Sequence, residues 1–174
     1  VHGDTTTSFA AALAGFYSNI RVAHVEAGLR TFDIFAPFPE EFNRQVTSKI
    51  TKWHFAPTET ASKHLINEGV SAQSIFITGN TVIDSLFWML DQIEANVEKK
   101  YRITNELNGL LSFEWQSEKF VLITGHRREN FGTGFEQICS AISILAKQFP
   151  EIHFVYPVHL NPNIKEIAHQ KLIA

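Results

Sequence analysis

Short apolar runs alternate with longer amphipathic segments along the first half of the chain. The apolar runs predict strands and the amphipathic segments predict helices, with strands at 22–25, 53–56 and 75–78 and helices at 9–17, 40–50, 58–68 and 81–90. This alternation is typical of a parallel sheet with helices packed on it. Gly79 and Asn80 interrupt the pattern, and Thr81 is expected to cap the helix that follows them.

The second half resumes the same alternation after a polar interval. Residues 94–119 are the most polar and least periodic part of the chain. Beyond them the pattern predicts a strand from Phe120, a helix at 135–148, a strand at 152–156 and a helix at 163–173. We therefore expect a domain boundary between residues 79 and 80.

A cluster of cations follows the strand that starts at Phe120. The sequence runs from an apolar stretch into His126, Arg127 and Arg128 and then into a helix. In an open parallel sheet, ligands lie outside the carboxyl ends of the strands, where the next helix presents free N–H groups and the positive end of its dipole. Arginine also matches phosphate in charge and shape. The segment indicates an anion site, with a solvated charged loop as the alternative.

Carboxylates stand at two other strand ends. Asp4 lies at a polar strand end that precedes the helix at 9–17, and Glu26 follows the strand at 22–25. A capping role for Asp4 and a local ion pair between Glu26 and Arg30 are the structural alternatives to a chemical role.

A third acidic site lies where a proline-rich loop enters the helix at 40–50. Glu40 and Glu41 fall in the first turn, where acidic side chains favour the helix dipole. Glu40 is also spaced to pair with Arg44 one turn later, which would stabilise the helix by a few tenths of a kcal/mol to about 1 kcal/mol. A positioned acid or base fits this turn at least as well.

Six motifs in this order give the chain a specific family resemblance: HGDTTTS, HVEAGLRT, PFPEEFNR, ITGNTVIDSL, TGHRREN and YPVHLNPN. Together they resemble the non-hydrolysing UDP-N-acetylglucosamine 2-epimerases of bacteria over nearly the whole chain. Phe32 stands where that family usually has glycine. A glycine at such a position usually allows a backbone angle or a close contact that a Cβ would prevent. Phe32 could therefore change the path of the loop at 31–37 relative to that family.

The resemblance implies an α/β fold of two Rossmann-like domains that face each other across a cleft, as in glycosyltransferase-B enzymes. Residues 1–79 would be the C-terminal part of the first domain. Residues 80–174 would be a linker helix region and the N-terminal part of the second. Since the chain lacks an initiator Met and stops after a helix, it is expected to be a central fragment with both domains incomplete.

The resemblance also implies the reaction and its residues. UDP would leave as the C2 proton is removed, and would return after a proton reaches the opposite face, so that UDP-N-acetylglucosamine and UDP-N-acetylmannosamine interconvert for surface polysaccharide synthesis. The catalytic residues would be Asp4, Glu26, Glu40 and His126, without a choice of acid and base among the carboxylates. The substrate-binding residues would be Arg44, Arg127 and Asn161, although Asn161 before Pro162 also suits a purely structural role in its loop.

The residues themselves favour elimination of the nucleotide over other chemical routes that could invert carbon 2 of the sugar. Direct deprotonation is implausible because no carbonyl acidifies the C2–H bond. Three routes remain: oxidation of a neighbouring hydroxyl by NAD, a Schiff base, and elimination of the nucleotide from C1. Gly132 and Gly134 lack the third glycine of a dinucleotide fingerprint, and no lysine has a buried, catalytic setting. Elimination needs a cationic cradle for diphosphate and acid–base groups on both faces of the sugar, which this chain has. We therefore expect no cofactor, and no metal, because no His or Cys pair has a ligand spacing.

Composition is that of an ordinary α/β enzyme. The chain has 174 residues, 44% hydrophobic and 19% charged, with a net charge of -3, so it shows no basic bias towards nucleic acid. Cys139 lies in an apolar helical pattern and is expected to be a reduced core residue. No apolar run is long enough for a membrane span, and a cytoplasmic enzyme that forms a homodimer at full length is expected. A hydrolysing 2-epimerase, a nucleotide-sugar glycosyltransferase and an inactive fragment or sensor are the alternatives.

Overall fold

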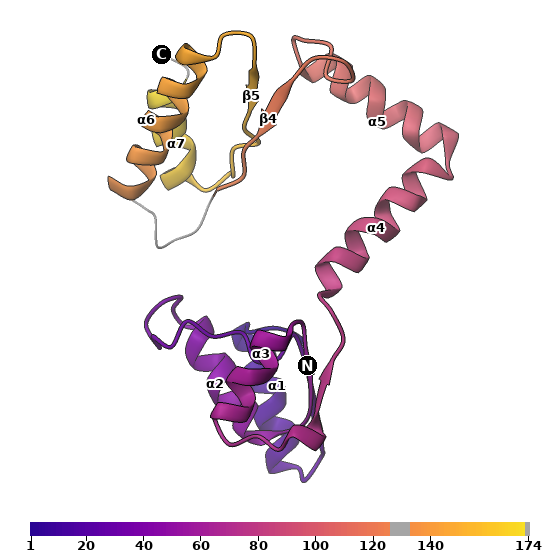
Figure 1. Cartoon of the computed structure of the whole chain (residues 1–174), viewed down its shortest axis with the longest axis vertical. Helices are drawn as coiled ribbons and strands as arrows, with labels where there is room; N and C mark the ends of the chain where they lie inside the picture. Colours follow the sequence, from indigo (N-terminus) through magenta and orange to yellow (C-terminus); the bar gives the residue numbers. More distant parts are fainter. Residues whose placement is uncertain (126–132, 173–174) are drawn as a thin grey trace. The chain divides into compact units, whose positions relative to one another are not determined.

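A computed structural model of the chain describes residues 1–125 and 133–172 (Figure 1). The chain forms two compact units, Val1–Gln92 and Ile93–Ala174. The assignment of residues 1–79 and 80–174 to two Rossmann-like domains stays a prediction. Each unit is described by itself below.

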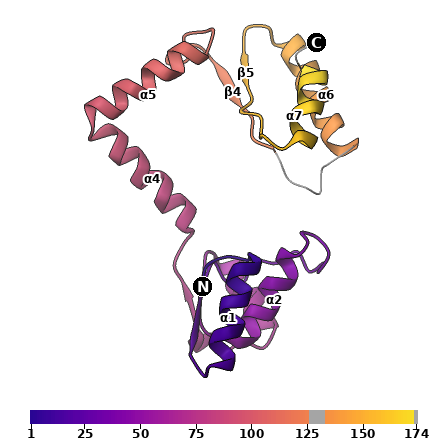
Figure 2. The same ribbon diagram turned by 180° about the vertical axis from the view of Figure 1, so that it is seen from behind.

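The first unit is built around a parallel sheet of order β1-β2-β3. Its elements are α1 (Thr6–Tyr17), β1 (Val22–Val25), α2 (Glu40–Ile50), β2 (Thr51–Ala56), α3 (Glu59–Asn67), the 3₁₀ turn η1 (Ala72–Ser74), β3 (Ile75–Ile77) and α4 (Thr81–Glu94). His2 forms a further parallel bridge to Val25, so residues 1–3 run alongside β1. Helices α1 and α2 pack against each other, as Figure 2 shows from behind. The predicted βαβα alternation is confirmed.

Side chains cap the starts of α1 and α4, but the capping residues differ from those that the sequence indicated. The hydroxyl of Thr5 accepts a hydrogen bond from the N–H of Ser8, so α1 begins at Thr6 and Asp4 is not its cap. Asn80 accepts from the N–H of Val82, and Thr81 is the first residue of α4 instead of its cap. Both expected caps were wrong by one residue, because Thr, Asn and Asp are close to equivalent as caps.

The second unit pairs two parallel strands, β4 (Phe120–Leu122) and β5 (His153–Val155), which are linked through α6 (Thr133–Gln148). Helix α7 (Pro162–Leu172) packs on α6 around a core of Phe135, Cys139, Ile164 and Ala168. Cys139 is fully buried, as predicted, and burial raises the pKa of its thiol. The polar interval that lacked periodicity contains α5 (Val97–Leu110), whose start is capped by the Asn96 side chain.

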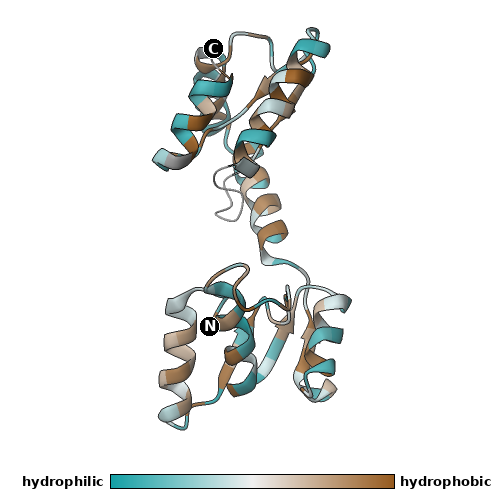
Figure 3. Ribbon diagram, turned by 90° about the vertical axis from the view of Figure 1, so that its left-hand side faces the viewer, coloured by the Kyte–Doolittle hydropathy of each residue, from teal (hydrophilic) through white to brown (hydrophobic). Residues whose placement is uncertain are grey.

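Several segments of helix α4 are coloured as hydrophobic in Figure 3, and seven of its large apolar side chains are exposed. Those exposed in the described part of the chain are Val82, Ile83, Leu86, Phe87, Trp88, Met89 and Leu90. Contiguous apolar surface of this kind usually marks an interaction site or a tendency to associate. Among the described residues, no helix has both the length and the apolar content to cross a membrane.

A close contact between the end of β1 and helix α3 fixes the core of the first unit. Gly28 has a φ of +87°, and a Cβ on it would lie 2.3 Å from the carbonyl oxygen of Ala61. The cluster around this contact consists of the small residues Ala27, Ala56 and Ala61 with Leu65. The α3 backbone can therefore approach the strand end only because residue 28 has no side chain.

We expect Gly28→Ala to lower the free energy of unfolding by about 3 kcal/mol or more, since left-handed strain contributes roughly 1–2 kcal/mol and overpacking roughly 1–3 kcal/mol. Gly69→Ala is the matched control, because Gly69 has a φ of +86° and open space where its Cβ would stand. It should lose only the strain, roughly 1–2 kcal/mol. Urea unfolding followed by circular dichroism measures both, and equal losses would show that the contact with α3 is unimportant.

Candidate functional site

Two of the predicted carboxylates lie side by side at the carboxyl edge of the first sheet. The N–H of Gly3 donates to the carbonyl of Val25, which holds the segment before Asp4 against the end of β1. Glu26 is the next residue of that strand end, and its Oε2 lies 3.2 Å from where a Cβ on Gly3 would stand. Asp4 and Glu26 thus reach the same edge, as the parallel arrangement predicted.

Arg44 of α2 holds Asp4. Its Nε and Nη2 donate to Oδ2 of Asp4 at 2.9 and 2.6 Å. The neighbouring Asn43 donates to the carbonyl of Asp4 at 2.8 Å. The alternative pairing of Arg44 with Glu40 is therefore not formed: the guanidinium turns to the sheet edge, where two of its N–H groups converge on one oxygen of Asp4.

Glu26 has a strained backbone. Its φ is +69°, in the left-handed region that costs a side-chain-bearing residue about 1–2 kcal/mol. Its Oε2 lies 3.6 Å from Nε2 of His2. The expected local pair with Arg30 is wrong, because Arg30 binds Glu68 at 2.6 and 2.9 Å instead. Strain of this kind persists when the surrounding structure over-determines it, and it gathers at functional sites.

Glu40 is half-buried in the first turn of α2. Its side chain has no hydrogen bond or ion pair within the described residues, unlike Asp4 and the adjacent Glu41. Asn43 and Arg44, which contact Asp4, are one turn further along the same helix. Glu40 therefore lies one helical turn before the residues of α2 that contact Asp4, and its carboxyl group is unpaired within the described residues.

Sequence reasoning gave no separate role to Glu41, which is fully buried. Its carboxylate accepts hydrogen bonds from the N–H groups of Thr31 and Phe32 at 3.1 and 3.2 Å, from Arg44 at 3.1 Å and from Gln45 at 2.9 Å. Burial by itself would raise the pKa of Glu41, but these hydrogen bonds outweigh it and the pKa lies below its ordinary value. The i,i+3 and i,i+4 spacing to Arg44 and Gln45 was the signal available in the sequence.

The loop that Glu41 holds contains the unusual Phe32. Its φ is +65°, which a glycine would adopt without strain, and this accounts for the residue that the resembling family usually has there. The ring contacts His64 edge-on, with centroids 5.0 Å apart, although the side chain is 67% exposed. The loop thus keeps the glycine-like backbone in spite of the substitution.

The remaining site predictions fall in the second unit. His126 and Arg127 lie outside the described residues. Asn161 uses its backbone carbonyl to accept from Ile164 and Lys165 at the start of α7, so it does shape its loop. Its predicted contact with substrate stays a prediction.

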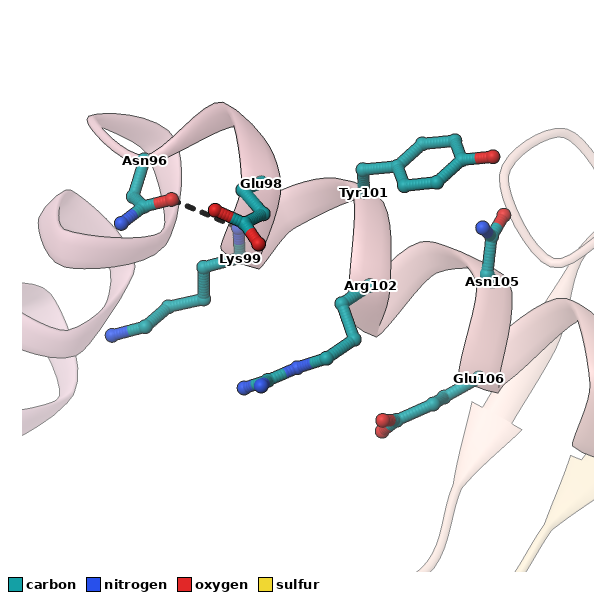
Figure 4. Close-up of a pocket in the computed structure, with 7 residues that line it drawn as sticks. All are labelled: Asn96, Glu98, Lys99, Tyr101, Arg102, Asn105 and Glu106. Atoms are coloured by element: carbon teal, nitrogen blue, oxygen red, sulfur yellow. Dashed lines mark hydrogen bonds between the residues drawn. The ribbon is translucent and has the colours of Figure 1, made fainter.

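Helix α5 carries a pocket of its own. The pocket in Figure 4 is lined by seven residues of α5 and its cap, and it contains none of the predicted site residues. Within the described part of the chain, no three His, Cys, Asp or Glu side chains are placed to hold a metal ion.

Two buried histidines lie beneath the sheet edge. His24 of β1 and His54 of β2 are partners in the parallel register. Nε2 of His24 donates to the carbonyl of Gly3 at 2.9 Å, which fixes the tautomer because a carbonyl only accepts. Nδ1 of each ring has no hydrogen-bond partner among the residues that the structure describes. Burial lowers the pKa of both groups, that of His54 to about 4 with the neighbouring His24 as a second cause.

The parallel sheet, its covering helices and the carboxylates at the strand ends define a Rossmann-like α/β enzyme class. The family model described as UDP-N-acetylglucosamine 2-epimerase matches residues 1–174, and the chain belongs to this family. The predicted α/β, glycosyltransferase-B-like fold class is thereby confirmed.

Curated relatives and solved structures agree with this assignment. UDP-N-acetylglucosamine 2-epimerases of Yersinia pestis and Escherichia coli K12 are both 51% identical, over 172 and 166 residues, which is 95% of this chain and 43% of each relative. The Neisseria meningitidis UDP-GlcNAc 2-epimerase bound to UDP-GlcNAc matches with a TM-score of 0.90 and 44% identity, over 100% of this chain and 46% of that one. The S. aureus MnaA–UDP structure gives 0.81 and 42%, over 99% and 44%. The chain thus spans less than half the length of these relatives.

The buried histidines predict a stability that falls with acid. Because the pKa of His54 is about 4 in the folded chain and 6.5 when solvated, the unfolded chain binds the proton first as the pH drops. The free energy of unfolding should therefore decrease between about pH 6.5 and 4, by roughly 2 kcal/mol at pH 5 relative to pH 7, and recover as the pH rises. His24 acts in the same direction.

Urea unfolding across this pH range measures the slope in the wild-type chain and in His54→Gln. The variant should start less stable but show a flatter dependence, since one titrating group is gone. His169→Gln is the control, because it removes an exposed imidazole of α7 without disturbing the core. An unchanged slope in His54→Gln would contradict the assignment.

Proposed function

We propose that the full-length protein interconverts UDP-N-acetylglucosamine and UDP-N-acetylmannosamine by eliminating UDP and adding it back. The observation that carries the proposal is the convergence of Asp4 and Glu26 at one sheet edge, with Arg44 reaching that edge from the helix that begins at Glu40. Membership of the family and a relative solved with UDP-GlcNAc support this substrate class.

The chemistry requires what this edge supplies. Removal of the C2 proton must accompany cleavage of the bond between C1 and the diphosphate oxygen, because no carbonyl stabilises a C2 carbanion. The product pair is 2-acetamidoglucal and UDP. A proton then adds to C2 from the opposite face as the diphosphate oxygen re-forms its bond to C1. Acid and base groups on both faces of the ring are needed, and Asp4, Glu26 and Glu40 are proposed to share these roles.

The arrangement of the carboxylates suits distinct tasks. Arg44 binds a single oxygen of Asp4, which orients the carboxyl group and leaves Oδ1 for substrate. Glu40 is the carboxylate without a protein partner among the described residues, so its proton transfers are not tied to an ion pair. The roles of acid and base among the three stay open.

The other elements of the proposal come from the family resemblance. His126 and Arg127 are proposed to meet the diphosphate, with His126 acting on the departing and returning UDP. Asn161 is proposed to approach the nucleotide. The enzyme is proposed to act as a cytoplasmic homodimer in surface polysaccharide synthesis, without a metal or nicotinamide cofactor.

Incubation of the full-length protein with UDP-N-acetylglucosamine in D₂O tests the proposed function. We expect UDP-N-acetylmannosamine with deuterium at C2, because the proton removed from one face exchanges with solvent before a proton reaches the other face. Free N-acetylmannosamine plus UDP would indicate a hydrolysing enzyme, and a sugar transferred to an acceptor would indicate a glycosyltransferase. Recovery of unlabelled substrate alone would reject the proposal.

We expect Glu40→Gln to lower kcat by roughly a hundredfold or more, because removal of a group that transfers protons in the transition state typically costs about 10²–10⁴-fold. Glu59→Gln is the matched control: Glu59 is also an acidic residue in a first helical turn, that of the neighbouring α3, and it is exposed. Both changes remove the same helix-dipole interaction. A similar kcat for the two variants would show that Glu40 is only a stabilising first-turn acid.

A further inference from the structure

The unassigned carboxylate of Glu41 connects two parts of the proposed site. Its Oε2 accepts from Nη1 of Arg44, while the other edge of the same guanidinium binds Asp4. Arg44 therefore lies between two carboxylates, one fully buried and one at the sheet edge. The buried partner fixes how the planar fork is turned, because a guanidinium can present only one edge to each neighbour.

Glu41 also holds the loop that leads to Glu40. The N–H groups of Thr31 and Phe32 converge on its two oxygens, and this anchors the first limb of the loop at 31–39 to α2. The hydroxyl of Thr31 donates to the carbonyl of Ala36, which closes the loop on itself. The second limb runs through Pro39 into Glu40.

We propose that Glu41 is a positioning residue that sets the geometry of both Asp4, through Arg44, and Glu40, through the loop at 31–39. The inference rests on the proposed function. Glu41 does not itself meet the substrate, because its side chain is fully buried. Catalytic groups must be held within about 0.5 Å of the productive geometry by residues whose own contacts are locked, and a misplacement of 1 Å can cost about a hundredfold in rate.

The variant Glu41→Gln tests the inference at nearly constant volume. A glutamine retains one acceptor oxygen but turns its NH₂ group towards N–H donors, so part of the anchor is replaced by a clash between donors. We expect kcat to fall by about 10- to 100-fold with KM changed by less than about threefold, because alignment is lost and substrate contacts are not. Amide hydrogen exchange at Thr31 and Phe32 should become faster at the same time.

Glu68→Gln is the matched control. Glu68 also forms an ion pair in the same unit, at 2.6 Å to Arg30, whose side chain is fully buried, and among the described residues it has no hydrogen bond or ion pair to Asp4 or to the loop at 31–39. This variant should lose stability, yet keep kcat and slow exchange at Thr31 and Phe32. Both variants are assayed in the full-length protein at a temperature well below their unfolding midpoints.

The outcomes separate this inference from the proposed function. A kcat for Glu41→Gln within about twofold of wild type, or a loss matched by Glu68→Gln, would overturn the positioning role. A wild-type protein with no epimerase activity would overturn the proposed function, and hydrogen exchange would then decide on Glu41 alone. Faster exchange in Glu41→Gln would support the anchor, and unchanged exchange would overturn it.

Discussion

The geometry of the first unit depends on a negative charge that has no access to water. An ionised carboxylate in the interior is tolerated only when donors replace its hydration, and Glu41 obtains four of them from the loop and from its own helix. Satisfying this one group forces α2, the loop at 31–39 and Arg44 into a single arrangement. Asp4 then meets a guanidinium that is already oriented.

Much of the fold could be predicted from the sequence because the local spacing of apolar residues indicates strands and helices. The strand at 22–25 and the helix at 40–50 have the predicted bounds, since β-branched residues and a proline entry mark their ends. Helix α5 was missed because few of its side chains pack against anything, so its sequence carries no strong apolar stripe. Asn96, which caps the start of α5, was the residue in the sequence that could have indicated this helix.

The sequence placed two carboxylates at a common sheet edge, but it did not predict the partners of the charged residues there. The placement of Asp4 and Glu26 follows from the rule that parallel strands end at a common edge, whereas Glu40 was singled out by the proline-rich loop that enters its helix. Their ion pairs were expected at helical spacings, whereas Arg44 binds Asp4 across 40 positions and Arg30 binds Glu68 across 38. Local rules cannot give such pairs, because the choice among several nearby carboxylates is made by tertiary packing and by the desolvation of the guanidinium.

The left-handed backbone of Glu26 favours glycine at this position for stability, whereas a chemical role would require the carboxylate. A glycine would relax the chain there, while a carboxylate is required if the residue handles a proton. Proteins that sit just above their stability threshold retain such conflicts only where activity outweighs the loss of stability. In a library selected for thermal resistance alone, position 26 would be among the first to change to glycine, and the change would remove the carboxylate from the sheet edge.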